Sequence, residues 1–386
     1  MSQLPEPYAS PDVTASAPHA PRRRGAARWA IAGCAALLVT GVAVSASQPG
    51  DTATGPATPS PGAASRSARV ADVPVVPVAF GTTPPAQAPG TFDPLVRFAR
   101  FGRLPAGMVP RTTVVQAGQR GGYTIEAGLP ERSLGAQVAV TFFPNGVAPH
   151  RDCHAAANMV RPPAGTKPSP AAPAAAHVHG KPAKLVDGRL RWEYAPGAWA
   201  EAVGKDLAAG AGDDPVANLD LLARIADDLH YGVESLRFPL VVGGVPDGLR
   251  LAVASVTERS KVGWGSVLIF TAGPYCHGSA TPQATLAVRA EAIIPGYGWT
   301  GDRSNATVDG RRAIKQQSPT GATDLAVYGD PGPYVIVSSS NEETTRLAGG
   351  DGLIPFYRHI QILGTTTLTT LAHPADQTSW TTAPTR

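Results

Sequence analysis

The chain has 386 residues, of which 43% are hydrophobic and 16% are charged, and it contains 42 glycines and 39 prolines. This length allows one large core or two small ones, and so many glycines and prolines predict long stretches without regular structure. Residues 1–46 carry four arginines against two acidic residues (+2), and the remainder carries 29 basic against 27 acidic residues (+2). A body so nearly balanced is not expected to bind nucleic acid, which requires a basic stripe facing the phosphates.

The first predicted element is a membrane-spanning helix at residues 29–46, after a tail at residues 1–28 that is predicted to be disordered. These 18 residues carry no charge and follow four arginines. An apolar run of about 17–25 residues spans a bilayer as a helix, and flanking arginines stay on the cytoplasmic side. We therefore expect a single-pass protein of the cell membrane, with a cytoplasmic N-terminus and an extracytoplasmic body.

Two other interpretations use the same residues. A cleaved signal peptide would end at Val44-Ser45-Ala46, but its apolar region is usually about 7–15 residues long and its basic region lies nearer the start. A lipoprotein would be acylated at Cys34 of "IAGC", but most of the apolar run follows this cysteine instead of preceding it. The retained anchor is the interpretation that we carry forward.

Three segments have a composition typical of disorder. Residues 47–90 are dominated by Pro, Ala, Gly, Ser and Thr, and bury too little apolar surface to offset the entropy lost on ordering. We expect this segment to be an extended tether. The same reasoning predicts a disordered insert at residues 161–184 and a disordered tail at residues 371–386.

Between the tether and the tail, short similar stretches recur in the same order, which suggests two copies of one unit. The pairs are "RLPAGM" with "GVPDGL", "VAVTFFP" with "VLIFTAGP", two Cys-His doublets, two "VDGR" stretches, and "EYAPGAWAEAV" with "VYGDPGPYVIV". Short apolar runs bounded by Gly and Pro indicate strands, and one stretch indicates a helix. We therefore predict an α+β fold of two tandem diverged repeats of antiparallel strands plus a helix, at residues 91–237 and 238–370.

The helix is predicted at residues 215–231. Asp214 is suited to the N-cap, Pro215 to the first helical position, and Gly232 to the end. One apolar stripe should face the sheet; it consists of Val216, Leu219, Leu222, Ile225, Ala226 and Leu229. Among the strands, "LRLAV" should place Leu249, Leu251 and Val253 on one face, and hairpin turns are expected at residues 194–197 and 330–332.

Each of the two cysteines in the body is followed by a histidine. Outside the cytoplasm a pair of cysteines is most simply a disulfide, and equivalent positions in two repeats can meet near a two-fold axis, so we expect Cys153 and Cys276 to be bonded. Two buried free thiols are an alternative. A metal site is another alternative, although adjacent residues on a strand point to opposite faces and chelate poorly. Its ligands would be Cys153, His154, Cys276 and His277, with His177 and His179 as possible extra ligands. We expect no bound metal and no cofactor.

The sequence contains none of the short motifs of nucleophilic, metal-dependent or nucleotide-dependent enzymes, so a catalytic role is the less favoured interpretation. The clustered aromatic residues Trp192, Tyr194 and Trp199 are candidates for a sugar or apolar ligand site. Packing around a hairpin is the favoured explanation, because aromatic residues often lie in such cores.

The stretch "LRWEYAPGAWAEAV", the richness in Ala, Gly and Pro, and the order of anchor, tether and body resemble those of uncharacterised single-pass membrane-anchored proteins of high-GC actinobacteria. This resemblance implies a location and no catalytic residues. An anti-sigma factor has the same topology, but 28 residues with several prolines are too few for its cytoplasmic helical domain. The expected function is a non-catalytic extracytoplasmic module that binds or senses an envelope component, a small ligand or a neighbouring membrane protein; a tethered envelope enzyme or a metal-binding envelope protein are the alternatives.

Overall fold

A computed structural model of the chain describes residues 77–118, 121–129, 135–149, 175–208, 214–257, 264–275, 284–291, 304–319, 321–329, 333–349, 352–363 and 380–386. The predicted α+β class is wrong. Of the described residues 51% are in strands and only 9% are in helices, and the strands pair antiparallel. The physical reason is that the body consists of short runs rich in β-branched and small residues, which favour sheet over helix. Some runs are buried almost throughout, as at Gln137–Phe142, and others alternate in burial, as at Thr285–Glu291.

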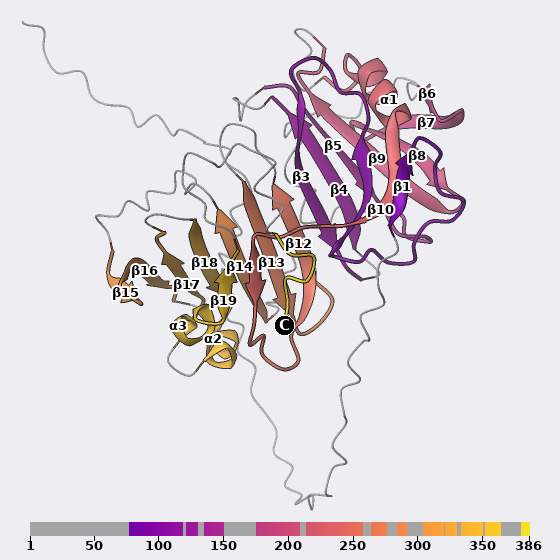
Figure 1. Cartoon of the computed structure of the whole chain (residues 1–386). Helices are drawn as coiled ribbons and strands as arrows, with labels where there is room; N and C mark the ends of the chain where they lie inside the picture. Colours follow the sequence, from indigo (N-terminus) through magenta and orange to yellow (C-terminus); the bar gives the residue numbers. More distant parts are fainter. Residues whose placement is uncertain are drawn as a thin grey trace, which may run out of the picture. The chain divides into compact units, whose positions relative to one another are not determined.

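Within the described residues, fourteen strands form one sheet (Figure 1). Half of it consists of β3 (Val109–Gln116), β4 (Gly122–Gly128), β5 (Gln137–Phe142), β9 (Ala198–Lys205), β8 (Arg189–Ala195), β7 (Lys181–Val186) and β6 (Ala175–Val178), in that spatial order. The other half consists of β12 (Arg250–Thr257), β13 (Gly265–Thr271), β14 (Thr285–Glu291), β18 (Tyr334–Ser339), β17 (Thr323–Val327), β16 (Arg311–Gln317) and β15 (Ala306–Val308). The halves join where β3 pairs with β12, with Val114 opposite Ser255.

Read outward from the β3–β12 pair, the two halves have the same topology. In each half, three consecutive strands are followed by the last strand of the set, and the remaining strands return towards the edge. A bulge also recurs. The register shifts between Pro110 and Thr112 in β3 and between Leu251 and Val253 in β12. The two bulges lie 141 residues apart in the chain (251 − 110 and 253 − 112). What recurs along the chain is thus an arrangement of strands.

Two small sheets complete the arrangement. The first has the order β1 (Val78–Gly81), β10 (Leu229–Ser235), β2 (Val96–Phe101), and the second pairs β11 (Leu240–Val242) with β19 (Ile360–Ile362). Strand β2 immediately precedes β3 and β11 immediately precedes β12, so the two small sheets occupy corresponding places in the two halves. Residues 380–386 lie along β11, with bridges from Phe238 to Thr381 and from Val242 to Thr385.

The three helices of the described residues are short. Helix α1 (Leu219–Asp227) contacts β6, β8 and β9, whereas α2 (Glu342–Ala348) and α3 (Leu353–Tyr357) contact β14, β17 and β18 (Figure 1). Part of the predicted stripe is buried in α1, namely Leu219, Leu222, Ile225 and Ala226. Leu222 lies against Gly204 of β9, where an added Cβ would be 3.0 Å from Leu222 Cδ2.

The predicted helix at residues 215–231 is wrong at both ends. Asp214 accepts hydrogen bonds from the N–H groups of Val216 and Ala217 in a turn, and the helix begins at Leu219. At the other end, Leu229 opens strand β10 and pairs with Phe101. Gly232 belongs to this strand, where a Cβ would lie 2.8 Å from Val78 O, so its role is to let β1 approach.

The bulge in β12 also corrects the face expected for "LRLAV". Leu249 and Leu251 contribute to the main hydrophobic cluster, which runs through both halves. Val253 belongs instead to a smaller cluster with Val114, Ala252, Ile269 and Tyr275. An extra residue in a strand turns the following side chains to the other face, and local alternation in the sequence does not reveal it.

The topology shows which of the repeated sequences correspond. "RLPAGM" with "GVPDGL" and "EYAPGAWAEAV" with "VYGDPGPYVIV" lie at matching turns, β2–β3 with β11–β12 and β8–β9 with β17–β18. The other pairs do not, because "VAVTFFP" covers β5 whereas "VLIFTAGP" covers β13, the counterpart of β4. Cys153 follows β5 and Cys276 follows β13, so the two cysteines are not at equivalent positions in the chain order.

Three segments that were predicted to be disordered contain strands or paired residues, and other predicted features lie outside the described residues. Within the predicted tether lies β1, within the predicted insert lie β6 and the start of β7, and within the predicted tail lie residues 380–386. The predicted anchor at residues 29–46 lies outside the described residues, and so do the predicted turn at 330–332 and both Cys-His doublets. No helix within the described part of the chain is long and apolar enough to cross a membrane.

Candidate anion-binding groove

The three aromatic residues predicted as a ligand site do not face one way. Trp192 and Tyr194 are fully buried in β8, and the Tyr194 hydroxyl donates to Phe143 O at 2.9 Å. Trp199 is 37% exposed. In the β8–β9 ladder Trp192 is opposite Ala200 and Glu193 is opposite Trp199, so Trp199 projects from the other face of the sheet. These residues do not enclose one site.

Of the histidines named as reserve metal ligands, His177 is exposed, and His179 lies at the β6–β7 turn, where its N–H donates to Asp227 Oδ1. Burial lowers the pKa of His179, and the Asp227 carboxylate acts in the opposite direction. Among the described residues no group of three or more His, Cys, Asp or Glu side chains is placed to hold a metal ion.

The structure brings together a different set of residues, at the junction of the two halves. A groove of about 120 Å³ lies between β2 and the ends of β3 and β4, and Val256 of β12 lines it from the other half. We call it the arginine groove. It is lined by Arg97, Ala99, Arg100, Phe101, Pro110, Arg111, Thr112, Thr113, Ile125, Glu126 and Val256.

Two of its arginines are held in place by contacts with neighbouring strands. The guanidinium carbon of Arg100 lies 4.5 Å from the ring centroid of Phe80 in β1. The side chain of Arg111 lies against Gly128 in β4, where an added Cβ would be 3.2 Å from both Arg111 Cδ and a terminal nitrogen. Arg111 is also the extra residue of the β3 bulge. Bulges commonly redirect a side chain towards a functional site.

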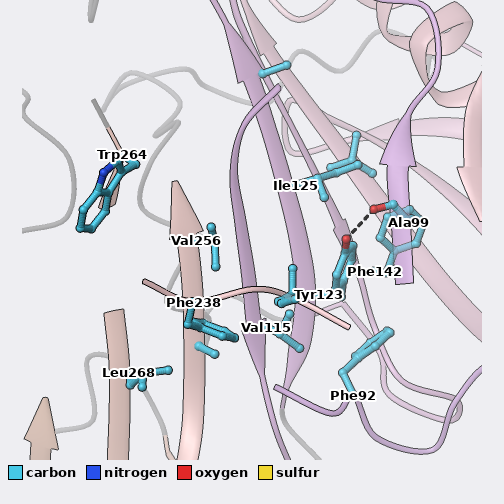
Figure 2. Packing of buried hydrophobic residues seen from close by; sticks show 14 of the residues in the cluster. Phe92, Ala99, Val115, Tyr123, Ile125, Phe142, Phe238, Val256, Trp264 and Leu268 are labelled. Atoms are coloured by element: carbon cyan, nitrogen blue, oxygen red, sulfur yellow. Dashed lines mark hydrogen bonds between the residues drawn. The ribbon is translucent and has the colours of Figure 1, made fainter. Parts of the chain in front are cut away.

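Tyr123 joins β2 to the large sheet beside this groove. Its hydroxyl donates to Ala99 O at 2.5 Å, as Figure 2 shows. Burial raises the pKa of Tyr123 to about 12, and the nearby Arg97 guanidinium acts in the opposite direction. The phenol is therefore protonated at neutral pH and remains a hydrogen-bond donor to the carbonyl of β2.

The charge of the groove lining is positive. Three arginines and one glutamate give a formal +2 (3 − 1), and Thr112 and Thr113 add hydroxyl groups. The hydroxyls of Thr112 and Thr257 are 3.3 Å apart, across the junction of the halves. Guanidinium groups bind carboxylates and phosphates through paired, charge-assisted hydrogen bonds, so this lining is suited to an anionic group.

Other shifted tyrosines reflect packing. Burial raises the pKa of Tyr194, Tyr231 and Tyr275, and the first two belong to the main hydrophobic cluster. Phe98 of β2 contacts Tyr194 and Tyr231 edge-on, at ring-centroid distances of 5.8 and 6.0 Å. These residues attach β2 and β10 to the large sheet and thereby fix the wall of the groove.

Reasoning from the sequence did not identify the groove. Its signal is the run Arg97-Phe98-Ala99-Arg100-Phe101, in which arginines alternate with aromatic residues. The near balance of charge in the body conceals this local excess. The approach of Arg111 and Val256 to the run depends on pairing between strands that are far apart in the chain.

No protein-family model, no curated protein and no solved structure matches this chain.

Proposed function

We propose that the chain is a membrane-anchored extracytoplasmic binding module and that the arginine groove binds an acidic ligand, either a component of the cell envelope or an acidic site on a neighbouring membrane protein. The observation that carries the proposal is the convergence of Arg97, Arg100 and Arg111 from two strands on one groove. Arginines spread over a solvated surface would not share a lining.

The chemistry of the lining supports binding. The two arginines held by Phe80 and Gly128 lose less conformational entropy on contact with a ligand than freely moving arginines would. Nearby hydroxyls supply neutral donors for the remaining oxygens of a carboxylate or phosphate. A tether between anchor and body would keep the module close to partners at the membrane and raise their effective concentration.

The test uses the full-length chain in detergent micelles, with succinate and inorganic phosphate as probes. Isothermal titration should detect binding of at least one probe, and Arg111→Ala should weaken that binding by about ten-fold, because a charge-assisted hydrogen bond is worth about 1.5–3 kcal/mol. Arg250→Ala is the matched control, since Arg250 is an exposed arginine at the start of β12 that does not line the groove.

Equal binding by the parent, Arg111→Ala and Arg250→Ala would place the anion elsewhere and refute the proposal. Loss of binding in both variants would indicate a general charge effect and would refute it as well.

A further inference from the structure

Strands β2 and β11 are counterparts, and their main-chain hydrogen bonds establish the register. The N–H of Gly102 donates to Asp228 O at 3.0 Å, and the N–H of Gly243 donates to His359 O at 2.9 Å. The turns that follow close in the same way, from Met108 N–H to Pro105 O and from Leu249 N–H to Pro246 O, both at 3.1 Å. All of these counterparts are 141 residues apart (243 − 102, 246 − 105, 249 − 108).

Each of the two strands has one edge paired within its small sheet, β2 with β10 and β11 with β19. The second edge of β11 is paired by residues 380–386, which we call the C-terminal segment. Phe238 and Thr381 exchange two main-chain hydrogen bonds of 2.8 and 3.0 Å. Further along the strand, Val242 N–H donates to Pro384 O at 2.7 Å, and Arg386 N–H donates to Val242 O at 3.0 Å. The C-terminal segment is therefore added to β11 as a short extra strand.

The first half closes the corresponding edge of β2 with a side chain. The Tyr123 hydroxyl donates to Ala99 O (Figure 2), and Tyr123 lies opposite Val115 in the β3–β4 ladder. The counterpart of Val115 is Val256 (115 + 141), which lies opposite Ser266 in the β12–β13 ladder. Ser266 thus stands in the place of Tyr123, and a serine hydroxyl does not reach as far as a phenol. Its Oγ is buried and has no hydrogen-bond partner among the described residues. The second half therefore closes this edge with a strand and not with a side chain.

One large side chain anchors the C-terminal segment. The ring centroids of Trp380 and Trp264 lie 5.6 Å apart, and each of these tryptophans is only 8% exposed. Pro384 is buried as well, whereas Thr382 and Ala383 are exposed. Sheets bind extended peptides in this way, through main-chain hydrogen bonds along an edge and a few inserted side chains. All of these contacts are made by seven consecutive residues, so the site can recognise them as a peptide.

The connection to the C-terminal segment is long enough to reach another molecule. Sixteen residues separate Leu363, which follows β19, from Trp380. A chain of this length spans at most about 60 Å when fully extended (17 steps of about 3.5 Å). The reach of the C-terminal segment is therefore not limited to the β11 strand of its own chain.

We propose that the C-terminal segment is exchanged between copies of this chain: it docks on β11 of a second copy as it docks on its own, and reciprocal exchange links two copies. A second copy is the partner because its residues 380–386 match the site residue for residue. Reciprocal exchange is symmetric and closes on itself, so it produces pairs and not open chains. Copies held in one membrane by the proposed anchor would have a high effective concentration for each other. The inference is otherwise independent of the arginine groove.

The first experiment asks whether the site accepts the segment from outside. A fluorescein-labelled peptide of residues 380–386 is titrated into the full-length chain in detergent micelles, and fluorescence anisotropy measures binding. In the parent, the resident segment competes at an effective concentration in the millimolar range. Trp380→Ala in the chain removes the anchor of the resident segment, so this variant should bind the peptide about ten-fold more tightly than the parent. Trp199→Ala, which alters an exposed tryptophan of the first half, is the control and should bind like the parent.

Strand addition is tested on the peptide, so that folding of the chain is not at issue. Methylating the peptide amide at the position of Thr381, whose N–H donates to Phe238 O, should weaken binding to the Trp380→Ala chain about ten-fold, because one main-chain hydrogen bond and close approach are lost. Methylation at the position of Thr382 should have little effect, because alternate amides of a strand point away from its neighbour.

The second experiment asks whether exchange joins two copies. The full-length chain is prepared with p-benzoylphenylalanine in place of Trp380, in an isotope-labelled and an unlabelled form, and both forms are reconstituted into the same lipid vesicles. Illumination cross-links position 380 to the residues around Trp264, and mass spectrometry identifies products that join a labelled to an unlabelled copy. We expect such mixed products in shared vesicles, and none when the two forms are reconstituted separately and mixed afterwards.

Each outcome bears on a different part of the inference. If the Trp380→Ala chain binds the peptide no more tightly than the parent, or if both methylations have the same effect, the strand-acceptor site on β11 is refuted. Peptide binding together with cross-links confined to single copies in shared vesicles would overturn the second copy as the partner. Neither readout involves an anion, and Arg111→Ala should leave peptide binding unchanged, so failure of this inference is distinguishable from failure of the arginine groove.

Discussion

Two glycines at counterpart positions test the architecture, because an added methyl group would overlap a backbone oxygen at one position and make only a tight contact with a backbone oxygen at the other. Gly102 follows β2, and a Cβ at this residue would overlap Asp228 O and lie 2.9 Å from Asp228 Oδ2. Gly243 follows β11, and a Cβ there would lie 3.3 Å from His359 O and 3.8 Å from His359 Cβ. Gly102→Ala and Gly243→Ala thus make the same chemical change in the same local topology.

The expected magnitudes follow from these contacts. In Gly102→Ala the backbone of Asp228 must move, which costs about 1–3 kcal/mol as overpacking. The shift also weakens the hydrogen bonds that Gly102 N–H and Arg103 N–H donate to Asp228, each worth about 1 kcal/mol. Replacing glycine restricts the unfolded chain and returns about 0.4–1 kcal/mol in both variants. The net loss is about 2–3 kcal/mol for Gly102→Ala and close to zero for Gly243→Ala.

Urea unfolding followed by circular dichroism measures the free energy of unfolding of both variants. In thermal unfolding, the midpoint should fall by roughly 5 °C in Gly102→Ala and stay within about 2 °C of the parent in Gly243→Ala. Because β2 forms a wall of the arginine groove, Gly102→Ala should also weaken succinate or phosphate binding. Equal stability of the two variants would refute the close approach of β2 to Asp228 and with it the placement of that wall.

Three further predictions concern other parts of the chain. Leu222→Ala should lower the free energy of unfolding by about 3 kcal/mol in urea titrations, because the side chain is fully buried against β9. Leu222→Asp should prevent folding, because it buries a charge without a partner. A parent-like unfolding curve of either variant would contradict that packing. Burial lowers the folded-state pKa of His179 below the ordinary histidine value of 6.5, so the unfolded state binds the proton more tightly. The free energy of unfolding should therefore be highest above about pH 6.5 and fall as the pH decreases through it. His179→Asn should reduce the difference in unfolding free energy between about pH 7.5 and about pH 5.5, and an unchanged difference would exclude this histidine as its source. The disulfide between Cys153 and Cys276 stays a prediction, and mass spectrometry of the non-reduced protein should find two protons fewer than in the reduced form, whereas two thiols that alkylate without reductant would exclude the bond.

Features that depend on neighbours in the sequence were predictable. The apolar stripe of α1 follows from the spacing of Leu219, Leu222 and Ile225, and the β8–β9 turn follows from Pro196-Gly197, where Gly197 has a φ of 72°. A helix stripe and a tight turn are determined by residues within about five positions of one another, so the signal is local. The alternation of arginines with aromatic residues in "RFARF" was also present in the sequence, although its meaning was not.

The tertiary structure alone decided the fold class and the site. Leu229 continues the helical pattern in sequence, yet it enters strand β10 because Phe101, more than a hundred residues earlier, is its partner. Likewise Arg111 and Val256 line the same groove only because β3 pairs with β12. The bulges at Arg111 and Ala252 are defined by the pairing of β3 with β4 and of β12 with β13. Strand pairing is set by registers between distant segments and by which faces become buried together, and a local sequence pattern that fits both helix and strand does not contain that information.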